Sequence, residues 1–179
     1  MTVGTGDFEL TIDELRVVAR FVVEAAEEVL PVFEAAHPDD PRPRAAVDAA
    51  WEFVNGAKRT NLQRVTASDA HRAAREAATE SGRLAARTAG DAAAAAYLHP
   101  IAKATQVSHI LRGPASAARI AELVAGDNPE VGDNFVARAK NHATPGLIDV
   151  LSRYPNAPTG KSRVDHLMSK LDSKLRKSR

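Results

Sequence analysis

Alanine supplies 35 of the 179 residues, and this bias constrains the fold more than any motif does. Alanine has the highest helix propensity of all residues, so a chain this rich in it favours helices throughout. Its side chain buries little apolar area, so alanine-rich helices must pack closely, and Leu, Val, Ile and a few aromatic residues supply most of the hydrophobic stabilisation. Runs of β-branched and aromatic residues typical of strands are missing. The sequence predicts an all-α fold, a single bundle of about seven or eight helices.

The composition argues against several classes of protein. The chain has no cysteine, which excludes disulfides, zinc–thiolate sites, iron–sulfur clusters and a cysteine nucleophile. The first residues lack the basic start and apolar run of a signal peptide, and charges interrupt every apolar stretch before it could span a membrane. We therefore expect a cytoplasmic protein without a membrane span. The bias towards Ala, Arg, Asp and Val is typical of a GC-rich genome, and we expect a bacterial source.

Charge is distributed unevenly along the chain. Residues 152–179 carry eight Lys or Arg against two Asp, a local charge of +6, whereas the whole chain has a net charge of only +1. The other residues are therefore mildly acidic. Together with the helix pattern this predicts three segments: a flexible lead-in over residues 1–10, an alanine-rich helical core over residues 11–126, and C-terminal helices over residues 127–179 whose basic tail packs on the core.

Residues with capping chemistry indicate where several helices begin. Thr11 and Glu14 have the spacing of a capping box, and apolar residues then recur every three or four positions as far as Val29. A polar residue followed by proline, which suits the first turn of a helix, marks three further starts at Asp40–Pro41, Asn128–Pro129 and Thr144–Pro145. These signals predict amphipathic helices after each of the four positions.

Other residues predict where helices end or bend. Pro31 is expected to kink or end the first helix, because proline lacks the backbone N–H that a helix interior needs. Ser68 is a candidate cap for a helix over residues 69–80, after a polar connecting segment. Ser81–Gly82 and Gly113–Pro114 are expected to separate neighbouring helices. Gly90 lies in an alanine-rich stretch and is expected to let another helix approach closely.

Two stretches of this sequence resemble a known family. The first runs from Val29 to Trp51 and reads VLPVFEAAHPDDPRPRAAVDAAW; the second runs from His71 to His99 and reads HRAAREAATESGRLAARTAGDAAAAAYLH. Both resemble the immunity-protein family of bacterial polymorphic-toxin systems, whose members are often labelled as an exonuclease subunit. The resemblance covers roughly residues 20 to 120. It implies a protein that neutralises a toxic partner.

The chain departs from that family in two places. A histidine commonly follows the Ala-Gly pair in the family, where this chain has Asp91 after Ala89 and Gly90. The basic tail beyond Asn141 has no counterpart in the resemblance. A role that depended on that histidine would therefore not carry over to this chain.

Several charged residues are candidates for binding a partner. Asp40, Arg42 and Arg44 lie among prolines that stiffen the backbone, so they could form a pre-ordered exposed patch. The alternative is a helix cap with neighbouring ion pairs. His71 and Arg75 are four residues apart on one helix face and could hold an anion or a carboxylate side chain; the alternative is an ordinary solvated face.

Four further residues are candidates for lining a ligand cavity. Asp91 lies in an apolar helix and needs a partner, for which Arg87, one turn earlier, is the nearest candidate. Trp51 could anchor a ligand, although its spacing with neighbouring valines favours a place in the core. Tyr97 and His99 complete the candidate lining of an internal cavity. The spacing of the histidines matches no compact ligand motif, so no metal and no cofactor are expected.

The basic tail offers a different class of function. Residues 161–179 form a basic amphipathic segment, which could bind nucleic acid through its charges or pack on the bundle through Val164, Leu167, Leu171 and Leu175. Aromatic residues that would stack on bases are absent from it. The Gly160-Lys161-Ser162 run lacks the upstream glycine of a phosphate-binding loop.

The sequence therefore favours a binding protein that gives immunity or self-resistance against a toxin protein or a toxic small molecule. An enzyme that uses Asp91, His99 or His71 as acid or base inside the bundle is the first alternative, and no nucleophile motif supports it. Nucleic-acid binding through the basic tail is the second. A homo-oligomer stays open, because the alanine-rich helices could pack within one chain or across a dimer.

Overall fold

The computed structural model describes residues 6–178, and these form an all-α bundle with no β-strand among them. The prediction of an all-α fold with seven or eight helices is confirmed. The helices are α1 (Ile12–Ala36), α2 (Arg42–Val54), α3 (Asn61–Glu76), α4 (Glu80–Ala94), the short 3-10 helix η1 (Ala95–Tyr97), α5 (Ala104–Val124), α6 (Pro129–His142), α7 (Pro145–Ser152) and α8 (Arg163–Arg176).

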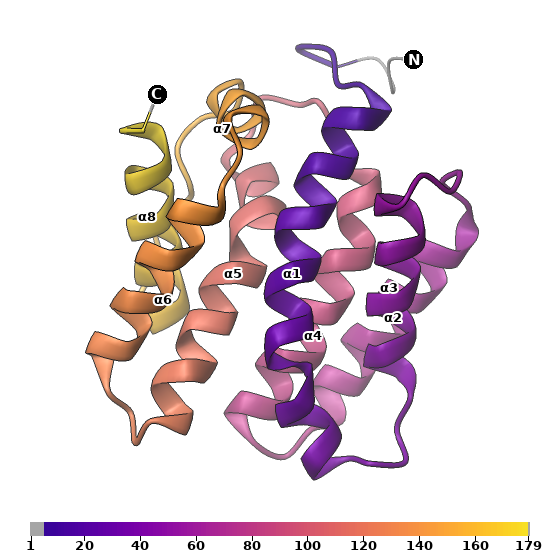
Figure 1. Ribbon diagram of the computed structural model, residues 1–179, viewed down its shortest axis with the longest axis vertical. Coiled ribbons are helices and arrows are strands. Elements are labelled where there is room, and N and C mark those ends of the chain that lie inside the picture. Colours follow the sequence, from indigo (N-terminus) through magenta and orange to yellow (C-terminus); the bar gives the residue numbers. More distant parts are fainter. Residues whose placement is uncertain (1–5, 179) are drawn as a thin grey trace.

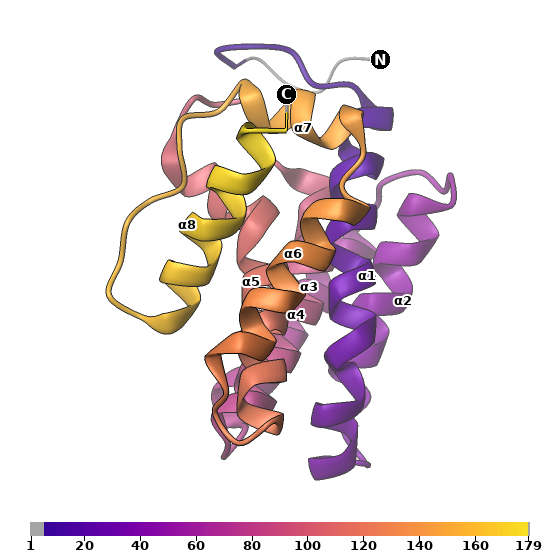
Figure 2. The same ribbon diagram turned by 60° about the vertical axis from the view of Figure 1, so that its left-hand side comes forward.

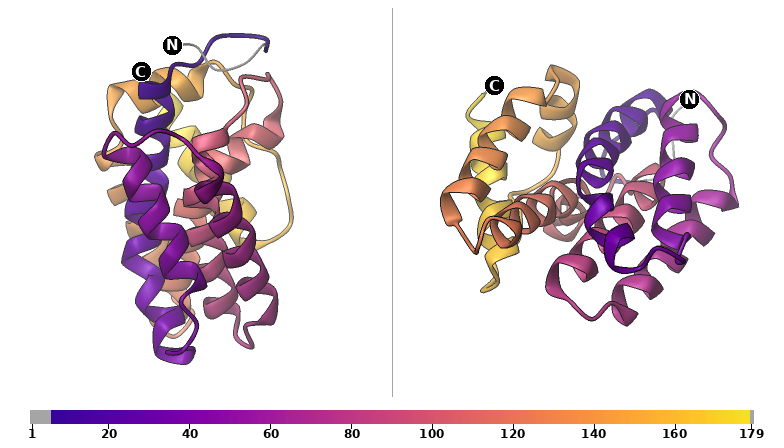
Figure 3. Two further views of the ribbon diagram at one scale, coloured as in Figure 1. Left: turned by 90° about the vertical axis from the view of Figure 1, so that its right-hand side faces the viewer. Right: turned by 60° about the horizontal axis from the view of Figure 1, so that its bottom comes forward.

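Helix α4 lies at the centre of the bundle. It contacts α1, α2, α3 and α5, and the long helices run roughly along the long axis of the molecule (Figure 1). Helices α6 and α8 pack on α5, on the side away from α2 and α3, and the right-hand view of Figure 3 shows these two groups of helices on opposite sides. Helix α7 lies across the end of the bundle near the start of α1.

Small residues make this central position possible. Five alanines of α4 are fully buried, so neighbouring helices approach its backbone on several sides. The alanines carry little hydrophobic area, and larger side chains from the surrounding helices supply it. The largest fully buried ones include Phe33, Phe53, Leu30, Ile110 and Leu167. Close packing of alanine-rich helices is therefore the way this core is built.

The capping signals place most helix starts correctly. Thr11 and Glu14 form the expected capping box at α1, and Asn128 and Thr144 cap α6 and α7 with proline at the first position. Helix α2 begins one residue later than expected, at Arg42. Asp40 still performs a capping role, because its Oδ1 accepts the backbone N–H of Arg42 at 3.1 Å.

Two expected helix boundaries in the middle of the chain are wrong. Helix α3 begins at Asn61, because Thr60 and Gln63 form a reciprocal capping box inside the segment predicted to be a connection. Ser68 is therefore inside α3. The turn before α4 comes at Thr79, whose Oγ1 accepts the backbone N–H of Gly82 at 3.1 Å. Ser81 and Gly82 lie in the first turn of α4 rather than in a break.

Two prolines also lie inside helices: Pro31, expected to kink or end the first helix, does not end it, and Pro114 does not separate two helices. Helix α1 continues past Pro31 to Ala36, and α5 continues through Gly113 and Pro114. Tertiary packing outweighs the missing hydrogen bond here, since buried residues flank both prolines. Gly113 allows α1 to approach α5 closely and does not end the helix. A Cβ at this position would lie 2.9 Å from Cγ1 of Val22, so glycine lets α5 pack against α1.

The first described residues pack against the bundle. Leu10 is fully buried, the backbone N–H of Asp7 donates to the carbonyl oxygen of Pro100, and Oδ2 of Asp7 accepts the backbone N–H of Ala102. The first half of the predicted lead-in, residues 1–5, lies outside the described residues. The division into a core and a C-terminal part stays a prediction.

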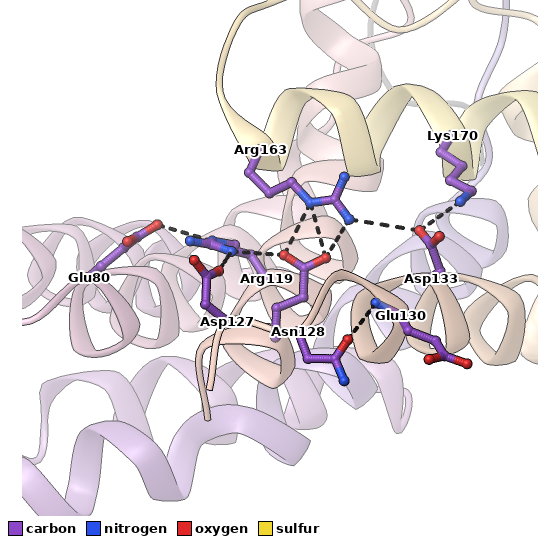
Figure 4. A network of polar contacts seen from close by, with 9 residues as sticks. Glu80, Arg119, Asp127, Asn128, Glu130, Asp133, Arg163 and Lys170 are labelled. Atoms are coloured by element: carbon purple, nitrogen blue, oxygen red, sulfur yellow. Dashed lines mark hydrogen bonds and ion pairs between the residues drawn. The ribbon is translucent and has the colours of Figure 1, made fainter. Parts of the chain in front are cut away.

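Helix α8 is fastened to the bundle by an apolar stripe and by a buried ion-pair network. Helix α8 lies alongside α5 (Figure 2). Leu167, Leu171 and Leu175 are fully buried, so the basic residues of α8 lie on its remaining faces. Glu122 of α5 is fully buried, and its carboxylate accepts hydrogen bonds from Arg119 and from Arg163 of α8 (Figure 4). No helix within residues 6–178 is long and apolar enough to cross a membrane.

Candidate functional site

A pocket of about 550 Å³ lies between α3, α4 and α5. Ligand pockets for small molecules fall in the range of about 300–1,000 Å³, so its size suits a bound group. Its lining residues are His71, Ala74 and Arg75 of α3, then Glu80, Arg83, Leu84 and Arg87 of α4, and Arg112 of α5.

Helical periodicity brings these residues to one place. The lining residues of α3 lie at steps of three and four positions, and those of α4 do the same over two turns. Residues at such spacing share one face of a helix. Because α3 and α4 are antiparallel neighbours joined by a three-residue turn, the two faces converge, and Arg112 enters from α5.

Positive charge dominates the pocket. Four of the eight lining residues are arginines, and Glu80 is the one carboxylate among them. Glu80 pairs with Arg119 at 3.3 Å, which lies outside the lining. Arg75 and Arg87 make no ion pair and no side-chain hydrogen bond with any residue from 6 to 178. Their guanidinium groups are therefore available to an incoming anion.

The other two arginines are held in place by the protein. Nη1 of Arg83 donates to the carbonyl oxygens of Ala77 and Ala78, at 3.3 and 2.9 Å. Arg112 makes a bidentate ion pair with Asp91, with Nε–Oδ2 at 2.9 Å and Nη2–Oδ1 at 2.6 Å. The Asp91 side chain is 1% exposed and that of Arg112 is 24% exposed. Asp91 thus anchors Arg112 from behind.

This pair corrects the expected partner of Asp91. The sequence suggested Arg87, one helical turn away, but Asp91 pairs with Arg112 from the next helix. Arg87 lines the pocket instead. Its pKa is lowered because packed neighbours displace part of its hydration and because Arg112 repels it. An arginine in these surroundings gains more from an anion than one in bulk water would.

His71 borders the same pocket above a glycine. A Cβ at Gly90 would lie 2.8–2.9 Å from three atoms of the His71 imidazole, so the glycine makes room for the ring. The close approach expected at Gly90 is therefore present. Nε2 of His71 lies 3.6 Å from Oδ1 of Asp91, too far for a hydrogen bond. Burial lowers the pKa of His71 despite the nearby carboxylate, so the ring is neutral at neutral pH.

The free energy of unfolding is expected to fall as the pH drops below the ordinary histidine pKa of 6.5. Burial lowers the pKa of both His71 and His109, so the unfolded chain binds protons at a higher pH than the folded chain does. The neutral rings contribute their full stabilisation above pH 6.5. This contribution is lost as the pH falls towards the pKa values of the two histidines in the folded chain. Urea unfolding at about pH 7.5 and about pH 5.5 measures this. Glutamine at both positions should reduce the dependence, and equal wild-type stability at both pH values would contradict it.

The predicted patch at the start of α2 is committed to internal ion pairs. Arg42 makes a bidentate pair with Asp40, at 2.8 and 2.7 Å, and also contacts Glu76 of α3. Arg44 makes a bidentate pair with Glu34 of α1, at 2.8 and 2.9 Å. The structure brings none of these arginines to the pocket. They fasten α2 to its neighbours, as the alternative interpretation held.

The remaining candidates are dispersed. Trp51 is half-buried, and its Nε1 donates to Glu27 at 3.1 Å. The Tyr97 hydroxyl donates to the carbonyl oxygen of Thr60 at 2.6 Å. His99 lies in the loop before α5, where its carbonyl oxygen accepts the Tyr154 hydroxyl. These residues line no shared cavity with His71. Of the nine predicted residues, the structure therefore brings together His71, Arg75 and, behind the lining, Asp91.

Sequence reasoning missed several lining residues. Arg83 and Arg87 share the spacing of four residues that drew attention to His71 and Arg75, so the pattern could have identified them. Arg112 carried no local signal, because its partner lies 21 residues away. Within residues 6–178 no group of three or more His, Asp or Glu is arranged to hold a metal ion.

Comparison with known proteins adds one finding. A family model with the description "Imm-5 like putative immunity protein" matches residues 9–104, just over half of the chain. This range includes α1 to α4 and every lining residue of the pocket except Arg112. No curated protein matches the chain. No solved structure matches it. The resemblance seen in the sequence is confirmed: the chain belongs to the Imm-5 like immunity-protein family.

Proposed function

We propose that this protein confers immunity by binding a toxic partner and blocking it, with the arginine-lined pocket between α3, α4 and α5 at the centre of the contact. The observation that carries the proposal is the pair of arginines, Arg75 and Arg87, that line the pocket without a protein partner within residues 6–178. Family membership supplies the class of function, and the pocket supplies a place for it.

The surroundings of these arginines favour binding over a purely structural role. The other charged side chains near the pocket already have protein partners: Glu80 pairs with Arg119, Asp91 pairs with Arg112, and Arg83 donates to two backbone carbonyl oxygens. Arg75 and Arg87 are exposed and have no such partner among residues 6–178, so an acidic group of a partner can reach them. Guanidinium groups bind carboxylates and phosphates through two parallel hydrogen bonds, which gives strength and geometric specificity.

The partner should present an acidic group to this face. Arginines outnumber the adjacent carboxylates four to two, counting Asp91 behind Arg112, so the pocket attracts negative charge. Complementary charge speeds association and selects the orientation in which the partner docks. Blocking then requires no chemistry, since occupancy of the partner's active surface is sufficient. The cytoplasmic location expected from the sequence stays a prediction.

Affinity capture tests this proposal. The tagged protein should retain a partner from an extract of its own cells, in a stoichiometric complex seen by native mass spectrometry. Expression of that partner alone should arrest growth, and co-expression with this protein should restore it. Replacement of Arg75 and Arg87 together by glutamine should weaken the complex by about thirtyfold or more, because truncating one side of a buried charge pair costs about 2–5 kcal/mol.

Arg72→Gln is the matched control for this experiment. Arg72 is an exposed arginine of the same helix that lies outside the pocket, and its contact with Asp69 is long, at 3.6 Å. The control should therefore retain the partner and protect growth. Loss of capture by the control and the double variant to the same degree would reject the pocket as the contact. A captured partner that leaves growth unaffected when expressed alone would reject immunity.

A further inference from the structure

We propose that the arginine-lined pocket binds a phosphate-bearing small molecule, with Arg75, Arg83 and Arg87 gathered around the phosphate. The inference concerns the same pocket as the proposed function and names the chemistry of the group that enters it. It does not require that a toxin binds there, since it rests on the volume, the donors and the charge of the pocket.

The pocket has many unused hydrogen-bond donors. Each guanidinium carries five N–H groups in a planar fork. Those of Arg75 and Arg87 donate to no residue within 6–178, and Nη1 of Arg112 is also without an acceptor there. Nη1 of Arg83 donates to two carbonyl oxygens, and these bonds orient the side chain. Its Nε and Nη2 have no protein acceptor among the described residues. A tetrahedral phosphate presents several oxygens and can accept from more than one such fork at once.

The charge of the pocket favours a dianion over a single carboxylate. Four arginines face two adjacent carboxylates, and His71 is neutral because burial lowers its pKa. This leaves an excess of about two positive charges, which a phosphate monoester would neutralise, since it carries about −1.5 to −2 charges at neutral pH. The Asp165 carboxylate of α8 attracts the Arg87 guanidinium only at longer range and makes no ion pair with it.

The shape of the pocket favours a small molecule over a lone ion. A volume of about 550 Å³ is far larger than one phosphate needs and lies within the range of pockets that hold whole small molecules. Ala74 and Leu84 form an apolar part of the lining, next to the arginines. A ligand with a phosphate at one end and a less polar body at the other fits this division.

Calorimetric titration with inorganic pyrophosphate tests the inference on the full chain. Pyrophosphate should bind with one-to-one stoichiometry at constant ionic strength, and citrate, a tricarboxylate of similar charge at neutral pH, should bind at least about tenfold more weakly. Replacing Arg87 by glutamine should weaken pyrophosphate binding by about tenfold, as should Arg75→Gln, because each removes charge-assisted hydrogen bonds. Arg72→Gln should leave the affinity within about twofold of wild type.

Amide chemical shifts locate the bound probe. Pyrophosphate should shift the signals of Ala74 and Leu84, and those of α8 should stay unchanged. Shifts confined to the lysines of α8 would overturn the inference, as would equal binding of citrate or equal weakening by Arg72→Gln. The two proposals fail separately. If partner capture depends on Arg87 but pyrophosphate does not bind, only the phosphate ligand is rejected. If pyrophosphate binds but substitution of Arg87 leaves capture unchanged, only the pocket as the partner's contact is rejected.

Discussion

Replacing Glu122 by alanine is expected to lower the free energy of unfolding by about 3–5 kcal/mol, which is the usual cost of removing one partner of a buried ion pair. Glu122 is fully buried, and its two oxygens accept from Arg163 of α8 at 3.0 and 3.1 Å and from Arg119 at 2.9 Å. Alanine would leave both guanidinium groups without this partner. The contact between α5 and α8 should therefore weaken first. Urea unfolding followed by circular dichroism would measure the loss of unfolding free energy.

The packing around Glu122 supports this large effect. Gly132 of α6 lies so close that a Cβ there would clash with Oε1 of Glu122, so α6 covers the carboxylate and keeps water out. The matched control is Glu130→Ala, an exposed glutamate at the start of α6, and it should change stability by less than about 0.5 kcal/mol. A loss below about 1 kcal/mol for Glu122→Ala would contradict the structural role of the network.

Asp91→Asn is expected to cost about 3 kcal/mol of unfolding free energy. Asparagine has nearly the shape of aspartate but cannot neutralise Arg112, which is only 24% exposed and would keep an uncompensated charge. Asp69→Asn is the control, because Asp69 forms an exposed pair with Arg72 at 3.6 Å and should cost at most about 1 kcal/mol. Chemical unfolding of the two variants side by side measures the difference.

A second variant separates the loss of the pair from general damage to α4. Asp91→Leu combined with Arg112→Met removes both charges and fills the space with apolar atoms. Such replacements of buried ion pairs are often neutral or stabilising, so the double variant should recover most of the stability lost in Asp91→Asn. A double variant as unstable as the single one would show that the site tolerates no change of shape, and that the charge is not the cause.

Much of the fold could be predicted because its signals are local. The capping chemistry of Thr11, Asn128 and Thr144 acts within one helical turn, so the sequence alone places the starts of α1, α6 and α7. The same chemistry at Thr60 and Gln63 was present in the sequence and was missed, because the residues that follow are mostly polar. Gly113–Pro114 shows the opposite case, in which tertiary packing against Val22 overrides a local signal for a break.

The candidate site was less predictable, because it depends on which helices become neighbours. Spacing along α3 drew attention to His71 and Arg75, and the structure places both in the pocket. Arg112 comes from a helix far along the chain, so no pattern near Asp91 could identify it. The prominent charges of the predicted patch at the start of α2 are paired within the protein, Asp40 with Arg42 and Arg44 with Glu34. A cluster of charged residues in a sequence can be assigned to a binding site only after the structure shows which of these residues pair within the protein.

The most direct test of the pocket as the binding site is the affinity of the captured partner for three forms of the protein. The forms are the wild type, the Arg75→Gln/Arg87→Gln double variant and the Arg72→Gln control, all first shown to unfold at similar urea concentrations. If the two pocket arginines contact the partner, the control binds as the wild type does, and the double variant binds about thirtyfold more weakly or not at all. Equal affinity of all three forms would contradict it, because the unpaired arginines of the pocket would then have no part in binding.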